Sequence, residues 1–444
     1  MTSSARPRRS QLVEFVFTLL TVAGLLWSLV DYFRFHRLPQ PFYFGLNESL
    51  TDWFVTALYA HQSGAYDYEI FSSIYPPVSF LFMKLTTLPA CYMQDAYYAR
   101  GCDTLAQFVI LLSYLGSVAI AWYAFWKNDR STAWMRGLTF GISFPLLFAL
   151  ERGNTIMVGF IFFVLGYGGV TRSRVGQLIG IAMAINFKPY LLAPAAADVL
   201  KRHWRFCEQI ALMTAFIYVT TFALFGEGDP LTIVANIQNF SGATVSFIWE
   251  RIYYATSLES FTFFDSYRFP TRDFIPGRYI EIAHVVIYIF MYTSLALMAV
   301  VFAAAWARPE AVPRIRLASL LLSLHLVTAA EGGYLFIFIV FLTFMERGNG
   351  KLVMGAVVCA YLQSIPYDIV LTTFITLNGD SWLSGRTTEF AIGPAVGMFL
   401  RPMLLNVMVW LVCWDSILKV TRTWRGNPPL LRLGHSRPLG PAAA

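Results

Sequence analysis

Long apolar runs separated by short polar segments repeat along almost the whole chain. A helix needs about 20 apolar residues to cross a hydrocarbon core of about 30 Å, and many of the runs come close to that length. No long polar stretch divides them, so the pattern predicts one all-α, polytopic membrane domain over residues 1–425, followed by a disordered cytoplasmic tail at 426–444. The candidate spans are residues 12–30, 71–90, 104–126, 137–150, 155–171, 175–187, 189–200, 207–225, 279–306, 316–330, 332–345, 352–376 and 396–420.

The composition excludes a water-soluble globular protein. Hydrophobic residues make up 57% of the chain and charged residues 13%, against about a quarter charged in soluble proteins. Continuous apolar runs also exclude an outer-membrane barrel, whose strands alternate over about ten residues. The net charge of +7 comes from short basic clusters beside the apolar runs, which indicates membrane topology and not nucleic-acid binding.

The basic clusters predict which helix ends face the cytoplasm. Lysine and arginine concentrate in cytoplasmic loops, so both termini are expected on that side of a cytoplasmic (inner) membrane. The first apolar run is long and lacks a cleavage site, so the first helix is expected to be retained. The clusters are Arg6/Arg8/Arg9, Lys127/Arg130/Arg136, Arg172/Arg174, Lys201/Arg202/Arg205, Arg308/Arg314/Arg316, Arg347/Lys351 and Lys419/Arg422/Arg425.

Two cytoplasmic termini require an even number of crossings, about twelve, so one candidate must enter and leave by the same face. The conflict lies at residues 71–90. If that run crossed fully, the helix at 104–126 would deliver the basic turn at 127–130 to the outside. Either 71–90 is re-entrant, or the turn is an exception to the charge rule.

Cys91 and Cys102 flank a short polar loop. They can pair only in an oxidising compartment and are otherwise two free thiols, and the sequence leaves both alternatives open. On the predicted topology the outer face carries the polar segments 31–70, 226–278 and 377–395, with short interfacial helices in them. The cytoplasmic loops are short and basic, so chemistry is expected on the outer face.

Asp52 is the strongest candidate for chemistry. It follows Ser49 and Thr51, either of which can cap a short helix with an aromatic and aliphatic face. In the first turn of such a helix the N-terminal dipole keeps a carboxylate ionised, as a general base must be. The alternative is that Asp52 only caps the helix.

Polar residues also interrupt the next apolar runs. Tyr75 is followed by two prolines, which fix the backbone where the chain re-enters the bilayer. Glu151, Arg152 and Asn154 stand together between two runs, where ionisable side chains are costly unless they pair or line a wet cavity. Mutual neutralisation of Glu151 and Arg152 is one expectation.

Lys188 lies between apolar segments, in the order Lys188-Pro189-Tyr190. A buried lysine needs a compensating anion, and a lipid phosphate suits that role. The alternative is that Lys188 reaches the membrane interface.

The remaining outer-side candidates are weaker individually. Arginines and aromatic residues mix in segment 226–278, where Arg251 and Arg268 suit phosphates and sugar faces or a membrane-interface belt. Glu331, Tyr334 and the Arg386/Glu389 pair carry the same ambiguity. Neither a metal-binding spacing nor a phosphate-binding glycine loop occurs, so no tightly bound cofactor or metal is expected, and a role for a divalent cation stays open.

Taken in order, these motifs resemble family 87 of the GT-C glycosyltransferases, membrane enzymes related to the polyprenol-phosphate-mannose-dependent mannosyltransferases. The resemblance covers about the first half of the chain. It rests on the acidic Asp52 in the first outer loop, Tyr75-Pro76-Pro77, Arg152-Gly153-Asn154 and Lys188-Pro189-Tyr190. The family often carries a histidine in a later outer-side motif, where this chain has Thr328-Ala-Ala-Glu331-Gly-Gly-Tyr334.

The resemblance implies a GT-C fold with an extracytoplasmic active site. It implies transfer of a hexose, mannose-like, from a polyprenyl-phosphate-sugar donor to a glycan or glycolipid acceptor. Asp52 would deprotonate the acceptor with inversion at the anomeric carbon. Lys188, Arg152 and Tyr190 would bind the donor phosphate, and the substrate cavity would include Tyr75, Glu151, Asn154, Arg251, Arg268, Glu331 and Tyr334.

Two other functions fit the same sequence. A lipid flippase or transporter also has about a dozen helices with buried charges, but here the charges cluster at one face without an internal repeat. A polysaccharide polymerase or ligase would instead use a polyprenyl-diphosphate donor and depend on outer-loop arginines. The resemblance favours the hexosyltransferase over both.

Overall fold

The computed structural model describes most of the chain as helix. The described residues are 8–42, 47–62, 66, 74–225, 228–238, 254–258, 265–266, 269–270, 272, 275–329, 331–347, 350–373 and 375–426. The first half holds α1 (Arg8–Phe35), α2 (Thr51–His61), α3 (Pro77–Thr86), η1 (Pro89–Tyr92), α4 (Ala96–Cys102), α5 (Thr104–Asn128), α6 (Ala133–Gly141), α7 (Phe144–Arg152), α8 (Ile156–Tyr167), α9 (Arg174–Phe187), η2 (Pro189–Ala195), α10 (Ala196–Leu200) and α11 (Trp204–Phe225).

The second half adds helices and two short hairpins. The helices are α13 (Gly277–Ala307), α14 (Arg314–Thr328), η5 (Gly333–Leu335), α15 (Phe336–Phe344), α16 (Lys351–Ser364) and α17 (Val396–Gly426). The antiparallel pairs are β1 (Asp265–Ser266) with β2 (Phe269–Pro270), and β3 (Ile375–Ser381) with β4 (Arg386–Ile392). In the second pair Ile375 lies opposite Ile392 and Ser381 opposite Arg386.

Local sequence explains where several helices begin. The carboxylates of Asp95 and Asp103 accept hydrogen bonds from backbone N–H groups in the first turns of α4 and α5. The Ser173 hydroxyl does the same for α9. Pro77 is the first residue of α3 and Pro145 the second residue of α7, within the first turn, where a missing N–H costs nothing.

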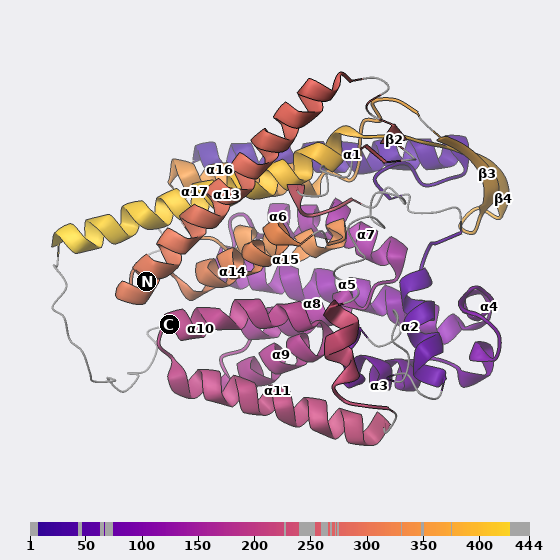
Figure 1. The fold of residues 1–444 in the computed structure, drawn as a ribbon, viewed down its shortest axis with the longest axis horizontal. Helices are drawn as coiled ribbons and strands as arrows, with labels where there is room; N and C mark the ends of the chain where they lie inside the picture. Colours follow the sequence, from indigo (N-terminus) through magenta and orange to yellow (C-terminus); the bar gives the residue numbers. More distant parts are fainter. Residues whose placement is uncertain are drawn as a thin grey trace.

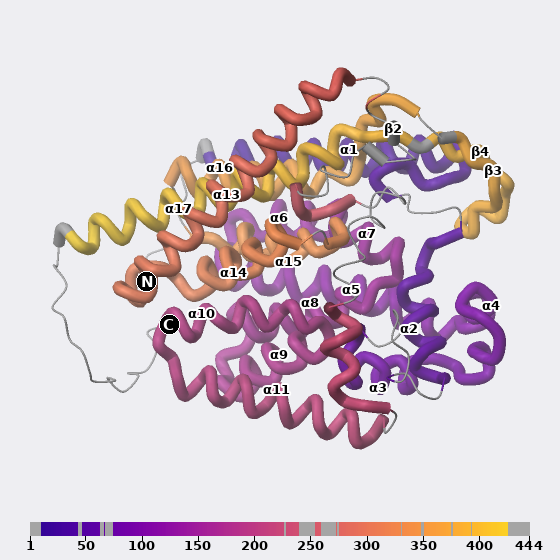
Figure 2. Tube along the Cα trace, in the orientation of Figure 1, coloured from indigo at the N-terminus to yellow at the C-terminus, as the bar shows by residue number. Residues whose placement is uncertain are grey.

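The long helices run along the molecule, and the polar connections gather at one end. In Figure 1, α1, α13 and α17 cross the upper part and α9, α10 and α11 the lower part, with α14 and α15 between them. At the right-hand end lie α2, α3, α4 and the β3–β4 hairpin. The Cα trace in Figure 2 shows the same arrangement without side chains. Segments distant in sequence therefore meet at a single end of the helix bundle.

Six described helices are long and apolar enough to cross a membrane, judged by length and composition. They are Ser10–Phe35, Thr104–Asn128, Ala133–Arg152, Trp204–Phe225, Gly277–Ala307 and Val396–Trp424. Large apolar side chains on them are exposed, among them Leu212, Phe216 and Val219 on α11 and Val285 and Ile289 on α13. Faces of this kind suit contact with lipid tails. The chain is thus a helical membrane protein, and the total of about twelve spans stays a prediction.

Two sequence-based boundaries are wrong. The candidate span 352–376 ends as a helix at Ser364, because the segment 365–373 is extended and residue 375 begins strand β3. The outer segment 377–395, for which interfacial helices were expected, holds most of the β3–β4 hairpin, so the fold is not all-α. The threonines and Gly379 in this stretch fit a hairpin better than a helix.

The candidate at 71–90 forms a short helix. The described helix α3 has 10 residues, which at 1.5 Å each span about 15 Å. That is half the thickness of a hydrocarbon core, so α3 alone is too short to cross it. This length agrees with the re-entrant alternative for 71–90.

Buried ion pairs join helices far apart in sequence. Arg136 of α6 donates to both carboxylate oxygens of Glu14 in α1, at 2.8 and 2.9 Å, and also to the Phe344 carbonyl. Arg316 of α14 donates to Glu346 at 2.8 and 2.6 Å and to Asp415 of α17 at 2.6 Å. Two arginines assigned to cytoplasmic clusters thus lie inside the protein.

Replacing Arg316 with leucine should strongly destabilise the fold. The variant leaves the carboxylates of Glu346 and Asp415 without this cation, and breaking one partner of a buried pair costs about 3–5 kcal/mol. Thermal unfolding of the purified protein in detergent measures the loss. The matched control is Glu310→Gln, which removes an ion pair with Arg308. The Glu310 carboxylate is 59% exposed, so this variant should lose little stability. Equal losses in both variants would contradict this explanation.

Candidate functional site

The backbone around Asp52 is tied to the end of helix α7. Leu50 precedes α2 in the left-handed conformation, with φ 64°, and its N–H donates to the Glu151 carbonyl at 2.6 Å. Arg152 donates to the Glu48 carbonyl at 3.0 Å. The expected side-chain cap is absent from α2, since Ser49 donates to the Glu151 carboxylate at 2.8 Å instead. The start of α2 is therefore held by contacts with α7.

Both carboxylate oxygens of Asp52 have fixed donors. Arg152 donates to Oδ1 at 2.5 Å, and the Asn154 side-chain amide donates to Oδ2 at 2.8 Å. The side-chain oxygen of Asn154 accepts a hydrogen bond from the N–H of Ile156 at 3.0 Å, which fixes the orientation of the side-chain amide. Each carboxylate oxygen has two lone pairs, so one on each is still available. The Asp52 side chain is 20% exposed, which leaves access to it.

The two neighbouring glutamates have different partners from those expected. Arg152 contacts Asp52 and lies 3.8 Å from the Glu48 carboxylate, while Glu151 accepts from Ser49. The Glu48 carboxylate also accepts from Thr51 at 3.0 Å and from Tyr97 at 3.1 Å. Arg152 thus forms ion pairs with the outer loop, and mutual neutralisation of Glu151 and Arg152 stays a prediction.

Gly153 allows this close approach between α7 and the outer loop. Its φ is 61°, and a Cβ atom added there would lie 2.9 Å from the Leu50 carbonyl oxygen and 3.0 Å from the Leu50 Cα. Only glycine combines that backbone conformation with that spacing at little cost. The glycine of the Arg152-Gly153-Asn154 motif therefore sets the distance between Asp52 and its two partners.

Replacing Gly153 with alanine should therefore displace the Leu50 segment. The matched control is Gly169→Ala, since Gly169 has φ 64° but open space around its would-be Cβ. Both variants bear the left-handed backbone cost of about 1–2 kcal/mol. Only Gly153→Ala adds a steric cost, of about 1–3 kcal/mol. It should also speed amide exchange at Leu50, which the added Cβ would contact. Thermal unfolding and hydrogen exchange measure both, and identical behaviour of the two variants would refute the spacing role.

Lys188 is buried at the junction of α9 and η2. Its side chain is 8% exposed, and its ammonium group lies 4.2 Å from the ring centroid of Tyr75. Within the described residues it has neither a hydrogen bond nor an ion pair. The ring of Tyr75 offers an attractive face but no negative charge, so none of the described residues supplies a counter-ion for the ammonium. An anionic ligand group would supply that charge.

Helix α8 connects Lys188 to the Asp52 site. Asn154 precedes α8, and a Cβ added at Gly159 of α8 would lie 3.9 Å from Lys188 Cγ. Five residues of helix amount to about 7.5 Å along its axis. The two groups of polar side chains thus lie near the same end of α8.

Tyr190 brings a histidine into the site that sequence reasoning missed. The rings of Tyr190 and His325 are stacked, with centroids 5.6 Å apart and planes at 12°. His325 Nε2 lies 3.5 Å from the Glu331 carboxylate. In the described part of the chain, neither Tyr190 Oη nor His325 Nε2 has a hydrogen-bond partner, although both atoms are buried. Buried polar atoms of this kind favour a ligand.

His325 lies six residues before Glu331, inside α14, where the sequence read as a continuous apolar span. The signal in the sequence was a single histidine within an otherwise apolar stretch. Tyr334 lies nearby, with its ring 6.0 Å from Phe148 of α7. Arg251 and Arg268 lie outside the described residues.

An apolar groove lies beside η2, two residues after Tyr190. It has a volume of about 500 Å³ between η2, α10 and α11, and its lining includes Leu192, Ala195, Val199, Ile210 and Val219. Leu192 is 58% exposed and Val219 65% exposed, so the groove opens toward the lipid-facing surface. An acyl or isoprenoid chain would fit such a lining.

Among the described residues, no group of three histidine, cysteine or acidic side chains is placed to hold a metal ion. No family model, curated protein or solved structure matches this chain. The function is therefore argued from the geometry of the site.

Proposed function

We propose that the chain is a membrane hexosyltransferase that uses a polyprenyl-phosphate-sugar donor and acts on a lipid-linked or polysaccharide acceptor. The observation that carries the proposal is the Asp52 carboxylate, bound by Arg152 and Asn154, near a buried lysine without a described counter-ion. A base and an anion-binding group at one end of α8 suit a reaction with a phosphate leaving group. The resemblance of the motifs to family 87 of the GT-C enzymes supports the same reaction.

In the proposed step, a hydroxyl oxygen of the acceptor attacks the anomeric carbon of the sugar. The bond between that carbon and the phosphate oxygen breaks, and polyprenyl phosphate leaves with the electron pair. The acceptor's proton passes to Asp52. One displacement inverts the anomeric configuration, and a phosphate leaving group needs no proton, so a single carboxylate suffices.

Lys188 then binds the phosphate, and charge increases there as the bond breaks. A preorganised cation in a partly dry site stabilises that charge more than water does. Arg152 binds the Asp52 carboxylate and the Glu48 carbonyl, so in this mechanism it holds the base in place. Tyr190 presents its hydroxyl, which has no hydrogen-bond partner among the described residues, to the sugar or the phosphate. His325, whose Nε2 lies 3.5 Å from the Glu331 carboxylate, stacks beside Tyr190, and the apolar groove beside η2 takes the polyprenyl chain.

The proposal places the reaction on the extracytoplasmic face. The disulfide between Cys91 and Cys102 supports this orientation, since it joins η1 to the end of α4, beside α2. Disulfides persist in oxidising compartments. Of the two sequence alternatives for these cysteines, the structure has the disulfide.

A donor comparison tests the proposal. Purified protein in lipid nanodiscs is given labelled polyprenyl-phosphate mannose, labelled polyprenyl-phosphate glucose and an oligosaccharide on polyprenyl diphosphate, each with a lipid-extract acceptor. Transfer from a monophosphate donor is expected. Transfer from the diphosphate donor alone would replace the proposal with a polymerase or ligase. Movement of labelled lipid across proteoliposomes without any transfer would replace it with a flippase.

A further inference from the structure

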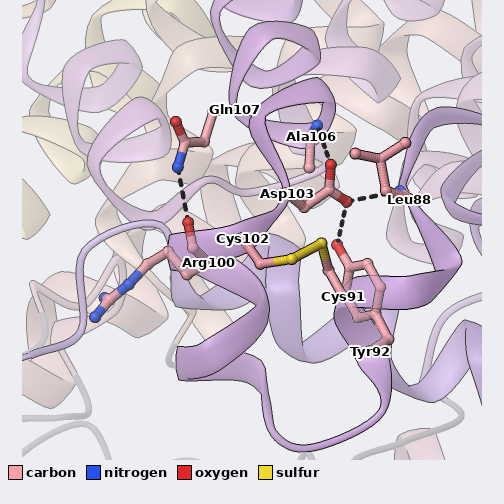
Figure 3. The surroundings of a disulfide bond; sticks show 8 residues. All are labelled: Leu88, Cys91, Tyr92, Arg100, Cys102, Asp103, Ala106 and Gln107. Atoms are coloured by element: carbon pink, nitrogen blue, oxygen red, sulfur yellow. Dashed lines mark hydrogen bonds between the residues drawn. A yellow bond between two sulfur atoms is a disulfide. The ribbon is translucent and has the colours of Figure 1, made fainter.

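A disulfide-closed loop carries an arginine that reaches into the Asp52 segment. The loop runs from η1 through α4 to α5, and Cys91 and Cys102 close it with an S–S bond (Figure 3). The Asp103 carboxylate accepts from the N–H groups of Ala106 and Leu88 and from the Tyr92 hydroxyl, at 2.9 to 3.0 Å. Both ends of the loop are therefore fixed to the start of α5.

Arg100 lies next to this closure and is 2% exposed. One of its terminal nitrogens donates to the carbonyls of Asn47 and Ser49, at 2.9 and 2.7 Å. The other donates to the Asn47 side-chain oxygen at 2.5 Å. All three acceptors lie in residues 47–49, just before α2, which carries Asp52.

The rest of Arg100 is also held in place. Its carbonyl accepts from the Gln107 side chain at 2.7 Å, and Trp382, in the turn between β3 and β4, lies 4.7 Å from the guanidinium. The planar guanidinium presents two terminal nitrogens to these acceptors in a fixed geometry, whereas a lysine has a single donor nitrogen. One buried side chain thus joins the closed loop, the hairpin turn and the segment that carries Asp52.

We propose that Arg100 is a positioning residue for Asp52, and that the Cys91–Cys102 disulfide holds Arg100 in the geometry that this requires. The inference rests on the proposed function, since Asp52 is the residue being positioned. Arg152 and Gly153 hold the segment from α7, and Arg100 holds it from α4, through residues 47–49. Arg100 touches no reacting group. It acts through the backbone, and misplacement of a base by about 1 Å can cost about 100-fold in rate.

The test compares two arginines that each lie over a tryptophan. Arg100→Gln removes the hold on residues 47–49, and Arg130→Gln is the matched control, because Arg130 is exposed and lies 4.4 Å from the ring of Trp126. Two readouts are taken on the full chain in nanodiscs. The first is hydrogen exchange at the amides of Leu50, Thr51 and Trp53, and the second is kcat and donor KM.

Arg100→Gln should raise exchange at these amides about 10-fold, because charge-assisted bonds to the segment are lost. It should lower kcat about 100-fold with donor KM within about twofold, since the donor site is elsewhere. Arg100→Lys keeps the charge but only one donor nitrogen, and it should give intermediate values. If Arg100→Gln is not monodisperse, Arg100→Lys replaces it in the test. Behaviour equal to Arg130→Gln in both readouts would overturn the inference.

The disulfide is tested with Cys91→Ser and Cys102→Ser and with reduction of the native chain. Each should change exchange and kcat in the same direction as Arg100→Gln, by a smaller factor, because Arg100 keeps its partners but loses the closure. An unchanged kcat after confirmed reduction would remove the disulfide from the inference. If the native chain transfers no sugar while Arg100→Gln still loosens residues 47–53, the proposed function fails and the positioning by Arg100 stands.

Discussion

Asp52→Asn is expected to lower kcat for sugar transfer about 1000-fold. The asparagine keeps the size of the side chain and one acceptor for Arg152 or Asn154, but it cannot take a proton from the acceptor hydroxyl. General bases contribute about 10²- to 10⁴-fold. Rates are measured with a polyprenyl-phosphate donor and purified protein in nanodiscs, and donor binding is measured separately.

The control for this variant is Asp380→Asn, an exposed aspartate in the β3–β4 hairpin that accepts from Thr387. It should keep native kcat. The expected pattern for Asp52→Asn is lost turnover with donor affinity within about threefold. Native turnover in Asp52→Asn would remove Asp52 from the mechanism and make Glu48 the nearest remaining candidate for the base.

Lys188→Met should lower kcat/KM for the donor about 100-fold. Methionine fills a similar volume but leaves the donor phosphate without its cation, and hydrogen bonds to charged groups contribute about 1.5–3 kcal/mol. The loss should fall on both KM and kcat, because the phosphate is charged before the reaction and more so as the bond breaks. Steady-state kinetics over a range of donor concentrations separates the two.

Lys84→Met is the matched control, because Lys84 also lies over an aromatic ring, 4.4 Å from the centroid of Phe225. A lysine that only stabilises packing would give similar results in both positions. Loss of activity confined to Lys188→Met supports phosphate binding. Equal kinetics in Lys188→Met and the native chain would leave the buried charge without a role in the donor site.

The sequence predicted the helical membrane class because few structures other than membrane-spanning helices accommodate long apolar runs. It also singled out Asp52, Arg152, Asn154 and Lys188, since each interrupts an apolar pattern where polar groups are costly. It could not predict which of them pair. Arg152 bonds to Asp52, 100 positions away, because the outer-loop segment at Leu50 packs against Gly153, next to Arg152.

Other features lay beyond the sequence pattern for similar reasons. Arg100 was not among the predicted site residues. Its role depends on contacts with residues 47–49, which follow no local periodicity. His325 looked like part of a span, and only the packing of η2 against α14 brings Tyr190 onto it. The β3–β4 hairpin was missed because the expected span 352–376 overlapped the start of β3, and the rest of the hairpin fell in the polar segment 377–395, where interfacial helices were expected.

The most direct test of the account is transfer of a labelled sugar from polyprenyl phosphate to an acceptor by the native chain in lipid, with the anomeric configuration of the product determined by NMR. We expect the native chain to form a glycoside of inverted configuration, and Asp52→Asn to form it only at background level. A product of retained configuration would contradict the single displacement, and equal transfer by the two proteins would contradict the role of Asp52.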